Sequence, residues 1–474
     1  MLRDHALLAV LAAVLAVLGA AGALWLSRRP SLAVAIALLS PLVSAALKGN
    51  SEEAEMADTG IGAYIRVSLL LLAGLAGLVA FLRARSGEAA RGRLPGQFLL
   101  LGAFLLLALA SAAWSVDPAY TLVKAGSFLA LACLLAGVVA WSREPGGIER
   151  VLNAAFGFSA LWALANLAAM ALWPARTWWW NAPDRFQGLS DHPNSMGGFC
   201  MMAYPLFLWK LMTSRGAVRL VAAAAIPACG LMQLLSGSRS SMIGAGVGIL
   251  VFLLAARRPR TALAFAGAVA LAAAAVLAHP PESLRREVSD DAAVNLTGRP
   301  DIWNASWRLF LERPLAGYGF ETQNKLLGDS EFQRIAGVNW TVLPSQSTHN
   351  GYLSVVLGGG AVAFLLWLAL LLLPYVRLLD LPPGPPRAVV LSIMTMSLAT
   401  NMVESLITGG GSLQAVIFWL AWALAARLPE APAGREALPA VDSDTARSGQ
   451  GPAGTAWTAG TRLAKRGKEG PPWR

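Results

Sequence analysis

Arginine and histidine side chains recur in the polar stretches between the apolar segments of this chain. The sequence holds four histidines, and one of them, His349, stands beside Asn350 where a long polar stretch gives way to an apolar run. A histidine side chain ordinarily titrates near neutral pH, so an imidazole here suits a general base that takes a proton from a hydroxyl group. Because a lone histidine is often structural, the nearby arginines decide how it is interpreted.

Three arginines lie in comparable polar stretches. Arg185 follows three consecutive tryptophans, Arg239 stands in Ser236-Gly237-Ser238-Arg239-Ser240-Ser241, and Arg299 opens Gly298-Arg299-Pro300-Asp301. A guanidinium group can donate two hydrogen bonds at once to the oxygens of one phosphate. Ser238 or Ser240 is placed to cap a helix whose N-terminus attracts phosphate. The alternatives are that the arginines reach lipid headgroups and that the tryptophans anchor helices at the membrane surface.

The elements that must position these residues are membrane helices. The chain is 56% hydrophobic and 14% charged, whereas soluble proteins carry about 25% charged residues. Its apolar runs have roughly the 17 to 25 residues that cross a bilayer as a helix, and they are too long and uniform for the strands of a membrane barrel. The composition predicts an all-α, polytopic transmembrane bundle of about 12–13 spans.

The expected spans are 6–26, 31–47, 62–82, 97–114, 121–141, 150–173, 195–212, 218–236, 240–256, 261–278, 350–374, 387–407 and 412–428. Their middles are nearly free of charge, and Lys124 and Glu404 fall near span ends. This favours an enzyme over a transporter of lipid-linked sugars, which would carry charged residues along a path through the bundle. The last two spans are divided by Gly409-Gly410-Gly411.

Loop charges predict the orientation. Basic residues gather in alternate short loops, which marks those loops as cytoplasmic and places residues 279–349 outside, in the periplasm of a Gram-negative cell. Apolar positions from Ile302 to Leu311 recur at three- and four-residue steps, which predicts an amphipathic helix in this outer loop. The expected organisation is helices in 1–278, the outer loop in 279–349, helices in 350–428 and a disordered cytoplasmic tail in 429–474.

Other classes of function are excluded. The net charge of +11 is spread over short loops and the tail, so it does not indicate nucleic-acid binding. The cysteines, Cys133, Cys200 and Cys229, lie in or beside apolar runs without metal-ligand spacing. No acidic pair with metal spacing stands on the outer face, since Asp290-Asp291 belongs to a solvated stretch. We therefore expect neither a metal nor another cofactor.

These motifs, taken in order, resemble the O-antigen ligase and polymerase superfamily. The resemblance covers roughly residues 97 to 425. It rests on Trp114-Ser115-Val116-Asp117-Pro118, Gly188 with His192-Pro193-Asn194, Ser236-Gly237-Ser238-Arg239, Gly298-Arg299 with Trp303, Pro314 with Gly317-Tyr318-Gly319, and His349-Asn350-Gly351-Tyr352-Leu353 with Gly358 and Gly360.

The resemblance implies a metal-independent, inverting glycosyltransferase of the bacterial inner membrane with a periplasmic active site. The donor would be a glycan on undecaprenyl diphosphate. The acceptor would be lipid A–core oligosaccharide in a ligase, or another lipid-linked repeat unit in a polymerase. A ligase is the leading hypothesis, because the single outer loop carries no extra soluble domain.

The resemblance also implies roles for individual residues. His349 would be the general base, and Arg239 and Arg299 would hold the diphosphate. Arg185 is added because of its place near a motif. Four further residues are expected to position substrate: Asn350, Tyr318, His192 and Asn194.

Overall fold

Apolar helices make up most of the described chain. The computed structural model describes residues 17–47, 61–86, 95–278, 299–335 and 347–428. After a first helical stretch, Val17–Leu26, the helices before the outer loop are α2 (Pro30–Leu47), α4 (Ile61–Ser86), α5 (Gln97–Ala110) continued by the 3-10 turn Ser111–Trp114, α6 (Pro118–Trp141), α7 (Gly147–Leu172), α8 (Pro174–Thr177), α9 (Pro193–Thr213), α10 (Gly216–Ser236), α11 (Arg239–Ala255) and α12 (Pro259–Ala278).

Within the described residues, the outer loop and the C-terminal part contribute six more helices. They are α15 (Arg299–Glu312), α16 (Gln323–Gly328), α17 (Ser330–Ile335), α18 (Gly351–Asp380), α19 (Pro385–Thr400) and α20 (Leu413–Ala425). A two-stranded antiparallel hairpin, β1 (Trp178–Trp179) with β2 (Ala182–Phe186), lies between α8 and α9.

The helices confirm an all-α, polytopic bundle. Within the described ranges, six helices are long and apolar enough to cross a membrane: α4, α5 with its 3-10 turn, α6, α7, α10 and α18. Shorter apolar helices accompany them, including α11 and α20. The expected span 6–26 lies partly, and the expected tail wholly, outside the described residues.

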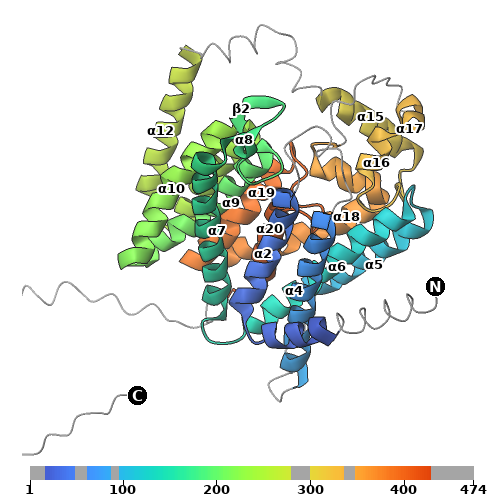
Figure 1. Cartoon of the computed structure of the whole chain (residues 1–474), viewed down its shortest axis with the longest axis horizontal. Coiled ribbons are helices and arrows are strands. Elements are labelled where there is room, and N and C mark those ends of the chain that lie inside the picture. Colours follow the sequence, from blue (N-terminus) through green and yellow to red (C-terminus); the bar gives the residue numbers. More distant parts are fainter. Residues whose placement is uncertain (1–16, 48–60, 87–94, 279–298, 336–346, 429–474) are drawn as a thin grey trace, which may run out of the picture. The chain divides into compact units, whose positions relative to one another are not determined.

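Small residues bring the helices into close contact. In Figure 1, α2, α4 and α6 lie side by side. Glycines on α4 and α6 lie where these two helices meet. A Cβ atom at Gly77 would lie 2.5 Å from the backbone of Leu134, so only glycine permits this approach. At the centre of the bundle, α20 is buried along its whole length and contacts α2, α6, α9, α18 and α19.

One expected span is wrong in its C-terminal part. The run 387–407 was expected to be helical throughout, but α19 ends at Thr400 and residues 401–412 form a non-helical segment before α20. The side-chain oxygen of Asn401 accepts hydrogen bonds from the backbone N–H groups of Leu406 and Ile407. Asn401 therefore satisfies backbone groups that a continuing helix would have satisfied itself, and the chain turns.

The outer loop carries the expected amphipathic helix. α15 buries Ile302, Ala305 and Leu309, whereas Trp307 is half exposed. Figure 1 shows α15, α16 and α17 gathered beside α18.

A break in α18 holds the outer loop at Tyr318 and Gly319. Gly360 has a left-handed backbone (φ 66°) inside α18. Around it, the N–H groups of Tyr318 and Gly319 donate to the carbonyl oxygens of Leu357 and Gly358, at 2.9 and 2.8 Å. The backbone groups that the break releases are therefore bonded to the outer loop, which holds the loop against a membrane helix.

Candidate active site

One buried carboxylate, Glu404, collects side chains from four other segments. Its Oε1 accepts hydrogen bonds from Arg299 Nη2 at 3.0 Å, Asn194 Nδ2 at 3.1 Å and Ser240 Oγ at 3.3 Å. Its Oε2 lies 3.3 Å from Nδ1 of His349. Because Glu404 is only 8% exposed, these partners replace the water that an ionised carboxylate would otherwise need.

Helix starts converge on this carboxylate. Asn194 stands in the first turn of α9, Ser240 in the first turn of α11, and Arg299 is the first residue of α15. His349 lies just before α18. Helix N-termini carry partial positive charge from unpaired backbone N–H groups, so their convergence favours anions in this region.

The backbone at His349 is held in a strained conformation. His349 has φ 44°, in the left-handed region, and its N–H donates to the hydroxyl of Ser347 at 3.2 Å. Trp303 of α15 donates its indole N–H to the carbonyl oxygen of Thr348 at 2.9 Å, and the buried hydroxyl of Thr348 lies 2.6 Å from that of Ser354. A non-glycine residue in this region costs about 1–3 kcal/mol, and such strain persists where surrounding contacts fix it.

The two residues after His349 connect it to the segment that holds Glu404. The side chain of Asn350 accepts from the backbone N–H groups of Tyr352 and Leu353, so Asn350 caps α18. Gly351 donates its N–H to the carbonyl oxygen of Asn401 at 2.8 Å. A Cβ atom at Gly351 would lie 2.2 Å from the side chain of Asn401, which explains glycine at this position.

The charges around Glu404 keep it ionised. Burial alone would raise the pKa of Glu404, but the hydrogen bond and charge of His349, followed by the charge of Arg299, lower it below its ordinary value of 4.5. In the neutral imidazole whose Nδ1–H donates to this carboxylate, the lone pair is on Nε2. Accepting a proton from a hydroxyl group at Nε2 is the chemistry of a general base.

Arg185 joins the site through Asn194. Its Nη2 donates to Asn194 Oδ1 at 2.9 Å, and its Nε donates to the carbonyl oxygen of Ser236, also at 2.9 Å. The guanidinium lies over the ring of Trp179, 5.7 Å from the ring centroid. The hairpin of β1 and β2 thus brings Arg185 to the start of α9.

Arg239 lies near the site because it directly precedes Ser240 in the chain. It is the first residue of α11 and is exposed, one residue before the hydroxyl that contacts Glu404. Ser238 occupies the N-cap position but makes no side-chain capping bond.

Two residues expected to position substrate are engaged within the fold. Nδ1 of His192 accepts the N–H of Asn194 at 3.0 Å and so caps α9, while its ring lies against Trp179 at 4.8 Å. The hydroxyl of Tyr318 donates to the carbonyl oxygen of Leu309 at 2.9 Å, and Tyr318 is buried in the apolar cluster formed with α15. Through these contacts, both side chains stabilise the fold.

Arginine contributes positive charge beside Glu404. Within the described ranges, no group of three or more His, Cys, Asp or Glu side chains is arranged to hold a metal ion. Arg185 and Arg299 instead bring guanidinium groups to the starts of α9 and α15.

Glu404 is the residue that sequence reasoning left out of the site. It was noted only as a charge near a span end. Ionisable residues inside apolar runs usually face a polar interior and mark function, so its presence in 387–407 was the available signal.

Two comparisons with known proteins bear on this site. Residues 220–368 match the protein family described as O-antigen ligase. This region includes Arg239, Arg299 and His349 but neither Arg185 nor Glu404. The chain is also similar to an O-antigen ligase of Pseudomonas aeruginosa, with 26% identity over 282 residues. That match covers 59% of this chain and 63% of the relative, which is less than two thirds of the relative's length.

Proposed function

We propose that this chain, which is similar to O-antigen ligases, transfers a glycan from undecaprenyl diphosphate to lipid A–core oligosaccharide. The observation that carries the proposal is the pair of His349 and Glu404 at 3.3 Å beside Arg299. A base and fixed cations are what a glycosyl transfer from a diphosphate requires.

The proposed reaction is a single displacement. A hydroxyl group of the acceptor gives its proton to Nε2 of His349 as its oxygen attacks the anomeric carbon of the donor sugar. The bond between that carbon and the diphosphate oxygen breaks, and its electron pair leaves with the diphosphate. Attack opposite the leaving group inverts the configuration at this carbon. Glu404 holds the imidazole in place and stabilises the imidazolium that forms.

The arginines bind the leaving group in this proposal. Arg185, Arg239 and Arg299 with Glu404 leave a net charge of two positive units, which matches the charge of about two negative units on a diphosphate diester. The charge that develops on the leaving oxygen is thus stabilised without a metal ion. The helix starts around Glu404 add to this field.

The proposed location is the periplasmic face of the bacterial inner membrane. Its support is the placement of basic residues in the short loops on the opposite side of the expected spans. A site at helix ends also suits two substrates that are anchored in the same membrane.

Transfer by the purified protein tests the proposal. The assay combines an undecaprenyl-diphosphate glycan with lipid A–core in detergent containing EDTA, and compares wild type with His349→Ala and Arg299→Ala. Glycan-capped core from wild type alone supports a metal-independent ligase with these roles. Longer undecaprenyl-linked chains without capped core would identify a polymerase. A folded wild type that makes neither product would contradict glycosyl transfer between these substrates.

A further inference from the structure

Three hydroxyl groups form a cluster between the segments that carry His349 and Glu404. The hydroxyl of Thr348 lies 2.6 Å from that of Ser354 and 3.1 Å from that of Ser405. The hydroxyls of Ser354 and Ser405 lie 3.0 Å apart, so each pair in this hydroxyl cluster is close enough for a hydrogen bond. Thr348 directly precedes His349, and Ser405 directly follows Glu404. The cluster therefore joins the immediate neighbours of both residues.

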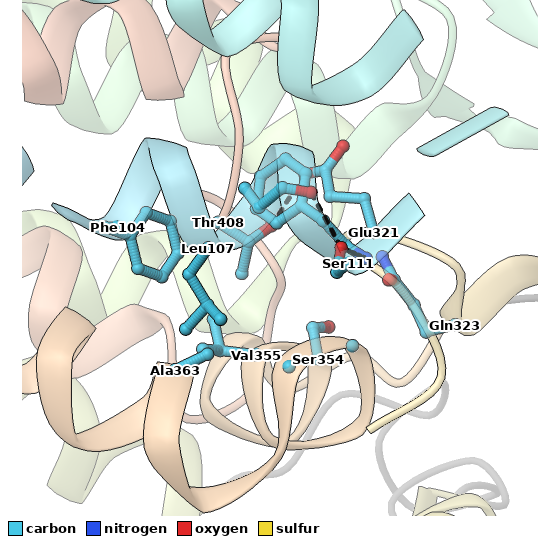
Figure 2. Close-up of a pocket in the computed structure, with 13 residues that line it drawn as sticks. Phe104, Leu107, Ser111, Glu321, Gln323, Ser354, Val355, Ala363 and Thr408 are labelled. Atoms are coloured by element: carbon cyan, nitrogen blue, oxygen red, sulfur yellow. Dashed lines mark hydrogen bonds between the residues drawn. The ribbon is translucent and has the colours of Figure 1, made fainter. Parts of the chain in front are cut away.

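The hydroxyl cluster lies inside the protein. Thr348 and Ser354 are buried, and Ser405 is half-buried. Figure 2 shows Ser354 of α18 in the lining of a small cavity, to which α5 contributes the apolar side chains of Phe104 and Leu107. Buried hydroxyl groups depend on protein partners in place of bulk water, so removing one member of the cluster is costly for the others.

The carbonyl oxygen of Asn350 connects the cluster to the start of α18. It accepts a hydrogen bond from the hydroxyl of Thr348 at 2.9 Å. Each hydroxyl group has one proton to donate. Three protons suffice for a chain of hydrogen bonds from Ser405 to Ser354, from Ser354 to Thr348, and from Thr348 to this carbonyl oxygen. Ser405 is thus the link between this chain and the segment of Glu404.

The contact that the cluster supports is sensitive to small displacements. Nδ1 of His349 lies 3.3 Å from Oε2 of Glu404, whereas a charge-assisted hydrogen bond measures about 2.7–2.9 Å. The left-handed backbone of His349 also needs contacts that hold it. Thr348 is held on its carbonyl oxygen by Trp303 and on its hydroxyl by the cluster. Loosening the cluster therefore lets the imidazole and the carboxylate move apart.

We propose that Ser405 is a positioning residue for the proposed base, acting through Thr348 and Ser354. Its hydroxyl holds the segment of Glu404 against the segment of His349. Oε2 of Glu404 then stays within reach of Nδ1 while Nε2 takes up the proton of the acceptor hydroxyl. The catalytic part of this inference rests on the proposed function, whereas the geometry can be measured without turnover.

Kinetics of glycan transfer test the catalytic part. Ser405→Ala removes one hydroxyl, so kcat falls about three- to tenfold while the KM values of donor and acceptor stay unchanged. Ser405→Thr keeps the hydroxyl and retains the wild-type kcat. The matched control is Ser392→Ala, which removes a buried hydroxyl that donates to the carbonyl oxygen of Gly248 at 2.6 Å. This control lowers the melting temperature and leaves kcat unchanged. Equal losses of kcat in Ser405→Ala and Ser392→Ala would overturn the inference.

A double-mutant cycle separates positioning from general stabilisation. In the Glu404→Gln background, Ser405→Ala lowers kcat no further, because the contact that Ser405 supports is already lost. A serine that only stabilises the fold would lower kcat by the same factor in both backgrounds, and that result would also overturn the inference.

Modification by diethyl pyrocarbonate, followed by peptide mass spectrometry, reports on the imidazole without turnover. The rate at His349 rises in Ser405→Ala and in Glu404→Gln, because an imidazole released from the carboxylate is less restrained. The rate at His192 in the same molecules, and at His349 in Ser392→Ala, stays at the wild-type value. An unchanged rate at His349 in Ser405→Ala would overturn the inference. A raised rate in a preparation that transfers no glycan would support the positioning and count against the proposed function only.

Discussion

Replacing Glu404 with Gln removes the charge on which the site converges and keeps the side-chain shape. Hydrogen bonds to charged groups contribute about 1.5–3 kcal/mol each. The contact with His349 strengthens as the imidazole takes up a proton, so its loss lowers kcat by roughly 10- to 150-fold. The contact with Arg299 exists before the reaction, and its loss lowers the free energy of unfolding by about 1–3 kcal/mol.

The assay is kcat for glycan transfer, measured beside the melting temperature. Glu404→Asp is the matched control, because it keeps the charge and retracts it by one methylene group. We expect it to retain more activity than Glu404→Gln. A folded Glu404→Gln protein with more than half of the wild-type kcat would refute the pairing of Glu404 with His349 as a catalytic arrangement.

Three further predictions concern the same site. The stability that ionised Glu404 contributes is complete above pH 4.5, its ordinary pKa, and is lost as the pH falls through the lower pKa of Glu404 in the folded protein. The melting temperature, measured as the pH is lowered, should show this loss in wild type and not in Glu404→Gln. Arg299→Lys should raise the donor KM about tenfold, because an ammonium group cannot contact both the Val403 carbonyl and Glu404 as the guanidinium does, and donor titrations at constant acceptor check this. Gly351→Ala should lower both the melting temperature by several degrees and kcat, because its Cβ atom collides with Asn401; an unchanged melting temperature would contradict the close contact.

Periodicity and residue type were sufficient for much of the fold. The three- and four-residue steps from Ile302 to Leu311 predicted α15, because burial of one helix face is a local property of the sequence. Arg299, Asn194 and His349 were recognised from their motifs, and the structure brings all three to Glu404.

What the sequence could not reveal is which motif residues meet. Glu404 lies 55 positions from His349 in a run whose hydropathy resembles a continuous span, so its role depends on the end of α19 at Thr400. The sequence also could not show that His192 and Asn350 cap helices. The same residue types either bond to nearby backbone N–H groups or bind substrate, so residue type alone does not decide between the two roles.

The left-handed backbone of His349 has an evolutionary consequence. Glycine adopts this conformation without strain, so mutations to glycine at position 349 relieve a local cost and remove the imidazole at once. Selection for stability alone would drive the position away from histidine. Histidine therefore occupies this position at a local cost, and a variant with glycine at position 349 is expected to be the more stable protein.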